Sequence, residues 1–207
     1  MPSPSPPRSS ARGSKGPALD EERLVERVLA GSDRAAARVL GHVGPAVLRT
    51  VRGVMGREDP EVEDLVQESF VALLRALPAF RGDSGLRTFA TRIAAKLAMS
   101  SLRRRYRRRD RDQRRPTVAH GPVDLDAALQ AEERLEMVRH VVARLPRVQG
   151  ETLLLRWVLG HSLAEVAEIT GAPVNTVRSR LRLGRNAMVA LLREHPRWRE
   201  LSEEDER

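Results

Sequence analysis

The sequence predicts an all-α chain of two small helical domains joined by a flexible basic linker. From Asp20 almost to the end, apolar residues recur three and four positions apart, which is the period of an amphipathic helix. No stretch alternates apolar and polar residues between turn signals, so no strand is expected. Residues 110–122 contain Pro116, Gly121 and Pro122 and lack this periodicity, which predicts a linker between two groups of helices.

The first predicted domain covers residues 19–109 and contains four helices. The second of these is expected from about Arg34 to Met55, after a Gly-Ser-Asp stop and cap. The third is expected to begin at Asp59-Pro60, a capping carboxylate followed by a proline, and to end at Pro78. The fourth follows a loop and runs into an arginine-rich segment. Its predicted inward residues are Leu86, Phe89, Ile93 and Leu97.

The second predicted domain covers residues 123–194. Pro146 separates its first two helices, because proline disfavours the helical conformation of the residue before it. Its last two helices, at about 162–170 and 174–194, flank a turn at Gly171. The first of these four helices is expected to bury one face, formed by Leu125, Leu129, Leu135, Val138, Val142 and Leu145.

Composition and charge point to a polyanionic partner. The 207 residues include 37 Lys and Arg against 28 Asp and Glu, a formal net charge of +9, and only Lys15 and Lys96 are lysines. A basic chain of this kind favours nucleic acid or an anionic membrane surface. No apolar run approaches the roughly 20 residues of a membrane helix, and the N-terminus lacks the apolar core of a secretory signal. We therefore expect a cytoplasmic protein.

Some chemistry is excluded by the residues themselves. Cysteine is absent, so disulfides, thiolate metal sites and a cysteine nucleophile are ruled out. The five histidines show no zinc-type spacing, and no glycine loop that could cradle a phosphate is present. We expect no metal and no cofactor. Residues 1–18, rich in proline and serine, are predicted to be disordered, and residues 195–207 form an acidic tail with no assigned role.

The clearest local pattern is a helix-turn-helix at residues 162–181. Ala167 is small where two helices must cross, Gly171 suits a left-handed turn, and Val177 is placed to point back into the pair. An ordinary helical hairpin with a solvated basic face is the alternative. The outward face offers donors suited to phosphates and base edges in a major groove, namely Asn175, Thr176, Arg178, Ser179, Arg182 and Arg185.

Two further patterns are weaker when taken alone. Arg92, Lys96, Ser100 and Arg103 fall within one arc of a helix that follows the loop at 80–85. Such a stripe could follow the backbone of a nucleic acid strand while the loop holds an unstacked base, although a solvated charged face is the commoner explanation. The acidic and amide groups of residues 64–68 lie beside an apolar stripe and could form a docking surface for a partner helix.

These segments, in this order, resemble two regions of bacterial RNA polymerase sigma factors of the sigma-70 family. Region 2 is resembled by Asp64-Leu65-Val66-Gln67-Glu68, Phe80-Arg81-Gly82-Asp83-Ser84 and Arg92-Ile93-Ala94 with the arginine cluster after it. Region 4 is resembled by Leu145-Pro146, Glu165-Val166-Ala167 and Thr176-Val177-Arg178-Ser179-Arg180-Leu181. A short linker without a region 3 is characteristic of the extracytoplasmic-function (ECF) group. The resemblance covers roughly residues 20–193.

The resemblance implies an alternative sigma factor, a non-catalytic subunit that binds core RNA polymerase and starts DNA-templated transcription in a stress or signal response. Residues 19–109 would bind core polymerase and the −10 promoter element, and residues 123–194 would bind the −35 element. The implied partners are the β′ clamp helices and β flap of core polymerase, promoter DNA and an anti-sigma factor, with no small-molecule substrate. Residues 105–121 would thread through the polymerase toward the RNA exit path.

The resemblance also implies site residues. Those expected to bind core polymerase are Asp64, Leu65, Gln67, Glu68, Leu73 and Leu74. Those expected at the −10 element are Phe80, Arg81, Gly82, Asp83, Ser84, Arg87, Arg92, Lys96, Ser100, Arg103 and Arg104. Those expected at the −35 element are Val174, Asn175, Thr176, Arg178, Ser179, Arg180, Arg182 and Arg185. The residues that depart from the usual family pattern include Phe89, Lys96, Ser100 and Thr170.

Two other functions fit parts of the pattern. A helix-turn-helix regulator could dimerise through its N-terminal domain and act on duplex DNA only. A helical enzyme acting on nucleic acid or nucleotides could use Asp64 and Glu68 as a carboxylate pair, although no convergent third group is visible in the sequence.

Overall fold

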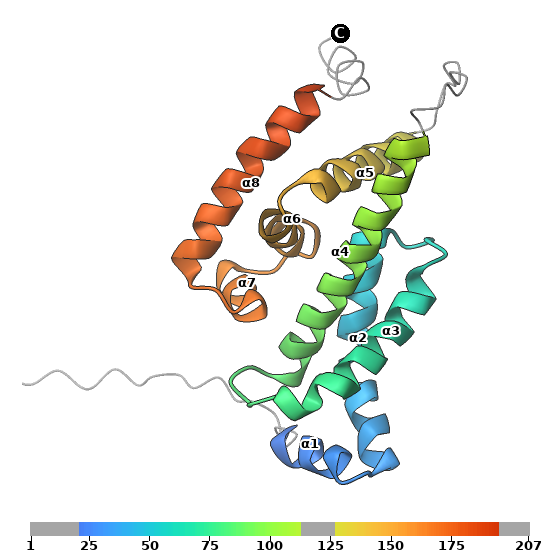
Figure 1. Cartoon of the computed structure of the whole chain (residues 1–207), viewed down its shortest axis with the longest axis vertical. Helices are drawn as coiled ribbons and strands as arrows, with labels where there is room; N and C mark the ends of the chain where they lie inside the picture. Colours follow the sequence, from blue (N-terminus) through green and yellow to red (C-terminus); the bar gives the residue numbers. More distant parts are fainter. Residues whose placement is uncertain (1–20, 113–126, 195–207) are drawn as a thin grey trace, which may run out of the picture.

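The computed structural model describes residues 21–112 and 127–194, and within these ranges it contains eight α-helices and no strand (Figure 1). The predicted all-α fold class is therefore confirmed. The predicted tails at 1–18 and 195–207, and most of the predicted linker at 110–122, lie outside the described residues. Among the described helices, none is both long enough and apolar enough to cross a membrane.

The N-terminal domain begins each of its main helices at a recognisable signal. The Ser32 side chain accepts a hydrogen bond from the Ala35 N–H at 3.3 Å, which starts α2. The Asp59 carboxylate accepts from the Glu61 N–H at 2.9 Å, and α3 starts at Val62, slightly later than predicted. The helices are α1 (Glu21–Leu29), α2 (Asp33–Met55), α3 (Val62–Ala76) and α4 (Leu86–Asp112), with a 3-10 turn at Leu77–Ala79 after α3.

Helix α4 is buried mainly through alanines rather than through the bulky residues that the sequence suggested. Leu86 is fully buried as predicted, but Phe89, Ile93 and Leu97 are only half-buried. The most deeply buried stripe is formed by small residues, which let α4 approach α2 and α3 closely. These small residues are Ala90, Ala94 and Ala98. Beyond them, the larger Met99 and Leu102 are also buried.

Leu135 and Trp157 are two large side chains that the C-terminal domain exposes. Leu135 was expected to face inward but is 46% exposed, because it lies two residues, or roughly 200° of helix, from buried Met137. Trp157 is 49% exposed. It follows the buried Leu154 and Leu155 in the π-helical turn. The elements are α5 (Ala127–Arg144), α6 (Arg147–Leu153) with the π-helical turn Leu154–Val158, α7 (Leu163–Thr170) and α8 (Val174–Glu194).

The helix-turn-helix has the turn at Gly171 and the buried Val177 that the sequence analysis predicted, together with a capping box at its start that was not predicted. The Ser162 hydroxyl accepts from the Glu165 N–H at 3.2 Å, and the Glu165 carboxylate accepts from the Ser162 N–H at 2.7 Å. The backbone hydrogen bond and then the side-chain hydrogen bond to Ser162 lower the pKa of Glu165. Gly171 ends α7 in the left-handed conformation at φ 66°, and Val177 is buried.

The two domains pack against each other along α4, with α5, α6 and α7 beside it (Figure 1). Val142, Leu145, Leu153 and Leu154 join the hydrophobic core of the N-terminal domain. Residues 105–112, which the resemblance assigned to the threading segment, continue α4 as regular helix in this structure. The Tyr106 hydroxyl donates to the Glu136 carbonyl at 3.2 Å, which fixes this part of α4 against α5.

Candidate nucleic-acid interface

The outward face of α8 is open to solvent. Asn175 and Arg178 lie in its first two turns, and the Arg178 Nη1 donates to the Asn175 Oδ1 at 2.9 Å. On the opposite side, a Cβ added to Gly184 would lie 2.9 Å from Leu153 Cδ1, so glycine lets α8 approach α6. Of the predicted set, Asn175, Arg178, Ser179, Arg182 and Arg185 are exposed, and Val174, Thr176 and Arg180 are half-buried.

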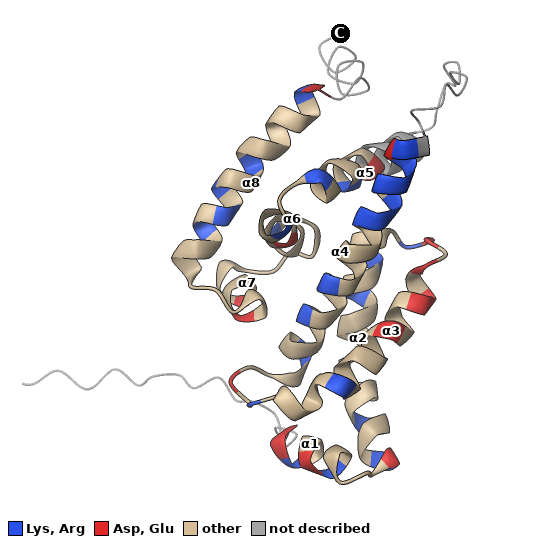
Figure 2. Ribbon diagram, in the orientation of Figure 1, with Lys and Arg blue, Asp and Glu red and all other residues tan. Residues whose placement is uncertain are grey.

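Helix α4 presents a second basic face, and Figure 2 shows its Lys and Arg residues along most of its length. Arg87, Lys96, Ser100 and Arg104 are exposed. Arg103 behaves differently, because it is half-buried and its Nη2 donates to the Leu145 carbonyl at 3.1 Å. Burial lowers the pKa of Arg103, and its Nε is buried without a hydrogen-bond partner.

Arg92 is also engaged within the molecule. It is exposed, but its Nη2 donates to the Glu168 carbonyl at 2.9 Å and its Nε donates to the Ile169 carbonyl. Both acceptors belong to α7 in the other domain. Two of the residues expected at the −10 element, Arg92 and Arg103, therefore contact the C-terminal domain in this structure.

The arginines at the end of α4 divide into two groups by the side of the helix that carries them. Arg105 is bound within the protein: its Nη2 donates to Asp59 Oδ1 at 2.8 Å, and this hydrogen bond to the Asp59 carboxylate raises the pKa of Arg105. Arg109 lies 2.5 Å from the Glu136 carboxylate and over the Tyr106 ring.

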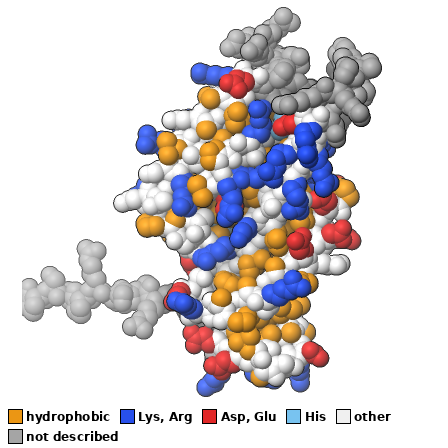
Figure 3. Space-filling view, in the orientation of Figure 1, with side chains coloured by type: hydrophobic (Ala, Val, Ile, Leu, Met, Phe, Trp, Pro, Cys, Tyr) orange, Lys and Arg blue, Asp and Glu red, His pale blue; other side chains and the backbone are white. Residues whose placement is uncertain are grey.

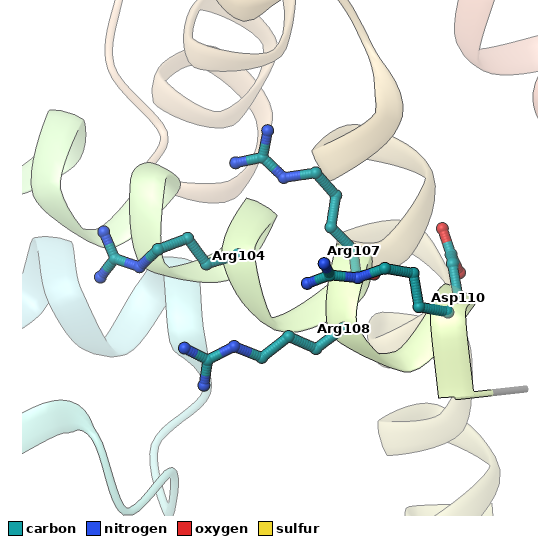
Figure 4. Close-up of a pocket in the computed structure, with 5 residues that line it drawn as sticks. Arg104, Arg107, Arg108 and Asp110 are labelled. Carbon is teal, nitrogen blue, oxygen red and sulfur yellow. The ribbon is translucent and has the colours of Figure 1, made fainter.

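The second group of arginines lines an open hollow of about 600 Å³ (Figure 4). The lining residues are Arg104, Arg107, Arg108 and Arg111, together with Asp110. Lys and Arg side chains gather on this face of the molecule (Figure 3).

The loop before α4 is held by α1, which the sequence did not reveal. The Leu86 N–H donates to the Glu21 Oε2 at 2.8 Å, so a carboxylate 65 residues away caps α4. The Phe80 ring meets the Phe89 ring edge-on at a centroid distance of 5.4 Å. Arg81, Gly82 and Asp83 are exposed, and Phe80 and Ser84 are half-buried.

Helix α3 carries an acidic and amide face with one apolar residue that sequence reasoning missed. Val71 is 47% exposed and lies seven residues after Asp64, so the two share one helix face. Leu65 is 3% exposed and Leu73 is 0% exposed, so both belong to the domain core and, contrary to expectation, offer no surface to a partner. The other predicted residues are exposed (Asp64, Gln67 and Glu68) or half-buried (Leu74).

In the part of the chain that the structure describes, no three His, Asp or Glu side chains lie close enough together to hold a metal ion. Asp64 and Glu68 are exposed on one helix.

Comparisons with known proteins match both domains in order. The family model described as "Sigma-70 region 2" matches residues 39–108, and "Sigma-70, region 4" matches residues 135–188. The chain is 36% identical over 128 residues to "ECF RNA polymerase sigma factor SigC" of Mycobacterium tuberculosis, covering 62% of this chain and 68% of that protein. It is 30% identical over 172 residues to "ECF RNA polymerase sigma-E factor" of Haemophilus influenzae, covering 79% and 90%.

A solved structure shares the arrangement of helices. It is described as "Structure of CnrH in complex with the cytosolic domain of CnrY", with a TM-score of 0.50 and 25% identity. The match covers 83% of this chain and 96% of that chain.

Proposed function

Because the chain belongs to the ECF sigma factors of the sigma-70 family, we propose that α3 binds core RNA polymerase while α4 and α8 bind promoter DNA. A sigma factor is the subunit that directs the polymerase to promoters and starts transcription. The order and coverage of the two family matches favour this function over a dimeric regulator or a helical enzyme. The proposal rests mainly on the exposed polar face of α8, which is the second helix of a complete helix-turn-helix.

Helix α8 would enter the major groove at the −35 element. Its first two turns carry Asn175 and Arg178, at the end that a helix-turn-helix presents to base edges. Arg182 and Arg185 follow on the same exposed face and suit the phosphates on either side of the groove. Thr176 and Arg180 are half-buried and would contribute their polar ends only.

Helix α4 and the loop before it would bind the −10 element. Lys96, Ser100 and Arg104 form an exposed line along which a strand backbone can lie. The loop at 80–85 would hold a base that has left the stack of the duplex. Glu21 fixes the end of this loop by accepting a hydrogen bond from the Leu86 N–H. Capturing such a base would offset an unpairing cost of a few kcal/mol.

The acidic and amide face of α3 would dock on the β′ clamp helices, with Asp64, Gln67 and Glu68 as the contact residues. Leu65 and Leu73 would hold that face in place from the core, and exposed Val71 would add apolar area. The −35 domain would meet the β flap. In this role the chain would act in the cytoplasm, and a stress or signal response is the setting expected for its group.

A protein inhibitor is the further partner that we propose. The solved structure of CnrH was obtained in complex with the cytosolic domain of CnrY, and this chain shares its arrangement of helices. An anti-sigma factor bound in a comparable way would control when the chain reaches core polymerase.

Reversing the charge of the α3 face is expected to weaken capture of core polymerase. The double variant Asp64→Lys with Glu68→Lys should raise the dissociation constant for purified core about tenfold, or about 1.4 kcal/mol, because two favourable charges become repulsive. Biolayer interferometry with immobilised core measures this change. The matched control is Glu26→Lys on α1, also an exposed carboxylate, which should bind as the parent does. Equal binding by the double variant would contradict the assignment of α3.

A further inference from the structure

The loop at 80–85 has few contacts of its own to fix its shape. Among the described residues, those at 81–84 form no hydrogen bond with one another or with the rest of the protein. At one end of the loop, the Phe80 ring packs edge-on against the Phe89 ring. A loop of this kind takes its position from the elements at its two ends, so the anchor before Leu86 decides where it lies.

That second anchor is Glu21, the first residue of α1. Its Oε2 accepts from the Leu86 N–H at 2.8 Å, and its Oε1 lies 3.3 Å from His42 Nε2 on α2. The carboxylate satisfies one of the N–H groups that lack a partner at the start of a helix, and its charge suits the positive end of the α4 dipole. One side chain therefore joins α1, α2 and α4 at the end of the loop.

Helix α1 lies beside the loop that leads into α4 (Figure 1), and its carboxylates lie against both loop glycines. A Cβ added to Gly82 would collide with Glu22 Oε1, and a Cβ added to Gly85 would lie 3.6 Å from Glu21 Oε2. Gly82 also has φ 73°, a conformation that favours glycine. The loop backbone thus follows the surface that α1 offers.

Helix α1 is itself fixed to the core of the N-terminal domain. Leu24 and Val25 are each 5% exposed and belong to the main hydrophobic cluster. The family model of region 2 matches residues 39–108, so α1 precedes the matched segment. A rigid element outside that segment therefore supports the loop within it.

We propose that Glu21 is a positioning residue for base capture at the −10 element, because it sets where the loop lies relative to the strand-binding face of α4. The inference rests on the proposed role of the loop and α4. Looseness of about 1 Å is enough to spoil a binding site built for one geometry. Loss of the Glu21 contact should therefore weaken base selection at one position, while Lys96 and Arg104 still hold the phosphates.

Substitutions at Glu21 separate its hydrogen bond from its charge. Glu21→Asp keeps the charge but is shorter by one methylene, so its carboxylate no longer reaches the Leu86 N–H. Glu21→Gln keeps the length, and its amide oxygen accepts the same hydrogen bond without the charge. Glu21→Ala removes both. The matched control is Glu26→Ala, which removes an exposed carboxylate from the same helix.

The probe is a pool of single-stranded DNA with about 20 random nucleotides, which is longer than the site of a typical single-strand binder. Holoenzyme reconstituted from core polymerase and the full-length chain captures strands from this pool. Sequencing gives the base preference at each position relative to core alone. The parent should discriminate about tenfold between bases at the captured position, and Glu21→Ala and Glu21→Asp should reduce this to about twofold or less.

The other positions of the selected motif should keep their parental preferences in these two variants. Glu21→Gln and Glu26→Ala should match the parent at every position, because both keep the hydrogen bond to the Leu86 N–H. Circular dichroism shows whether each variant folds. If Glu21→Ala folds poorly, Glu21→Asp decides the question, since it keeps a carboxylate in the first turn of α1.

Parental selection in both Glu21→Ala and Glu21→Asp overturns the inference and leaves the proposed function standing. Equal weakening at every position, or failure of Glu21→Gln to keep the preference, shows a general structural role and overturns it as well. A parent holoenzyme that selects no motif beyond core alone overturns the proposed role of the loop and α4 itself, and the role of Glu21 with it.

Discussion

Replacing Arg178 by alanine is expected to lower transcription from a promoter that depends on its −35 element by about 10- to 100-fold. A good base-edge contact in the major groove is worth about 1–3 kcal/mol. Arg178 lies exposed near the start of α8, and its hydrogen bond to Asn175 at 2.9 Å orients the guanidinium before DNA arrives. Quantitative transcription in vitro on one promoter, with and without its −35 element, measures the effect.

Arg193→Ala is the matched control for Arg178→Ala. Arg193 is exposed in the last turn of the same helix, roughly 22 Å along the helix axis from Arg178 and beyond the last proposed DNA contact, Arg185. It should leave −35-dependent transcription close to the parental level, and neither substitution should change capture of core polymerase. Loss of core binding in Arg178→Ala, with normal response to the −35 element, would mean that α8 has been assigned the wrong partner.

Replacing Leu73 by alanine is expected to lower the free energy of unfolding by about 2–5 kcal/mol, because the change leaves a cavity in a fully buried position. Urea unfolding followed by circular dichroism measures the loss. Val71→Ala on the same helix is the control, since Val71 is 47% exposed and should cost less than about 0.5 kcal/mol. Similar costs for the two variants would contradict the position of Leu73 in the core.

The helix-turn-helix could be predicted well because its signals are local. The capping box at Ser162 and Glu165 is a further local signal, a serine with a glutamate three residues later, that was not used in the prediction, and both of its hydrogen bonds are present. Gly171 has the left-handed backbone that a turn between two close helices needs. Once these two ends are fixed, helical periodicity decides which side of α8 is buried and which side is exposed.

Helix α4 was harder to predict because its packing depends on distant parts of the chain. Its buried stripe of alanines carries little hydrophobic signal, so the bulkier Phe89, Ile93 and Leu97 appeared to be the inward face. A basic sequence also gives no sign of which arginines are bound inside the protein. Arg92 reaches a carbonyl 76 residues away, and only the fold brings such groups together.

The phase of helix α3 explains why Leu65 and Leu73 were wrongly expected to contact core polymerase. A family resemblance assigns a role to a segment of helix, but the phase of the helix decides which of its residues meet solvent. In α3 the exposed phase contains Asp64, Gln67, Glu68 and Val71, and the leucines lie on the opposite side. The surface that α3 offers to a partner therefore includes fewer residues than the sequence motif suggests.

Transcription reconstituted in vitro is the most direct test of the claim that this chain directs core polymerase to two-part promoters. Purified core, the full-length chain and a library of genomic fragments would be incubated with nucleotides, and the 5′ ends of the transcripts sequenced. The account predicts a discrete set of start sites that share two upstream elements at fixed spacing and that core alone does not use. The same start-site profile with and without the chain, across the whole library, would contradict it.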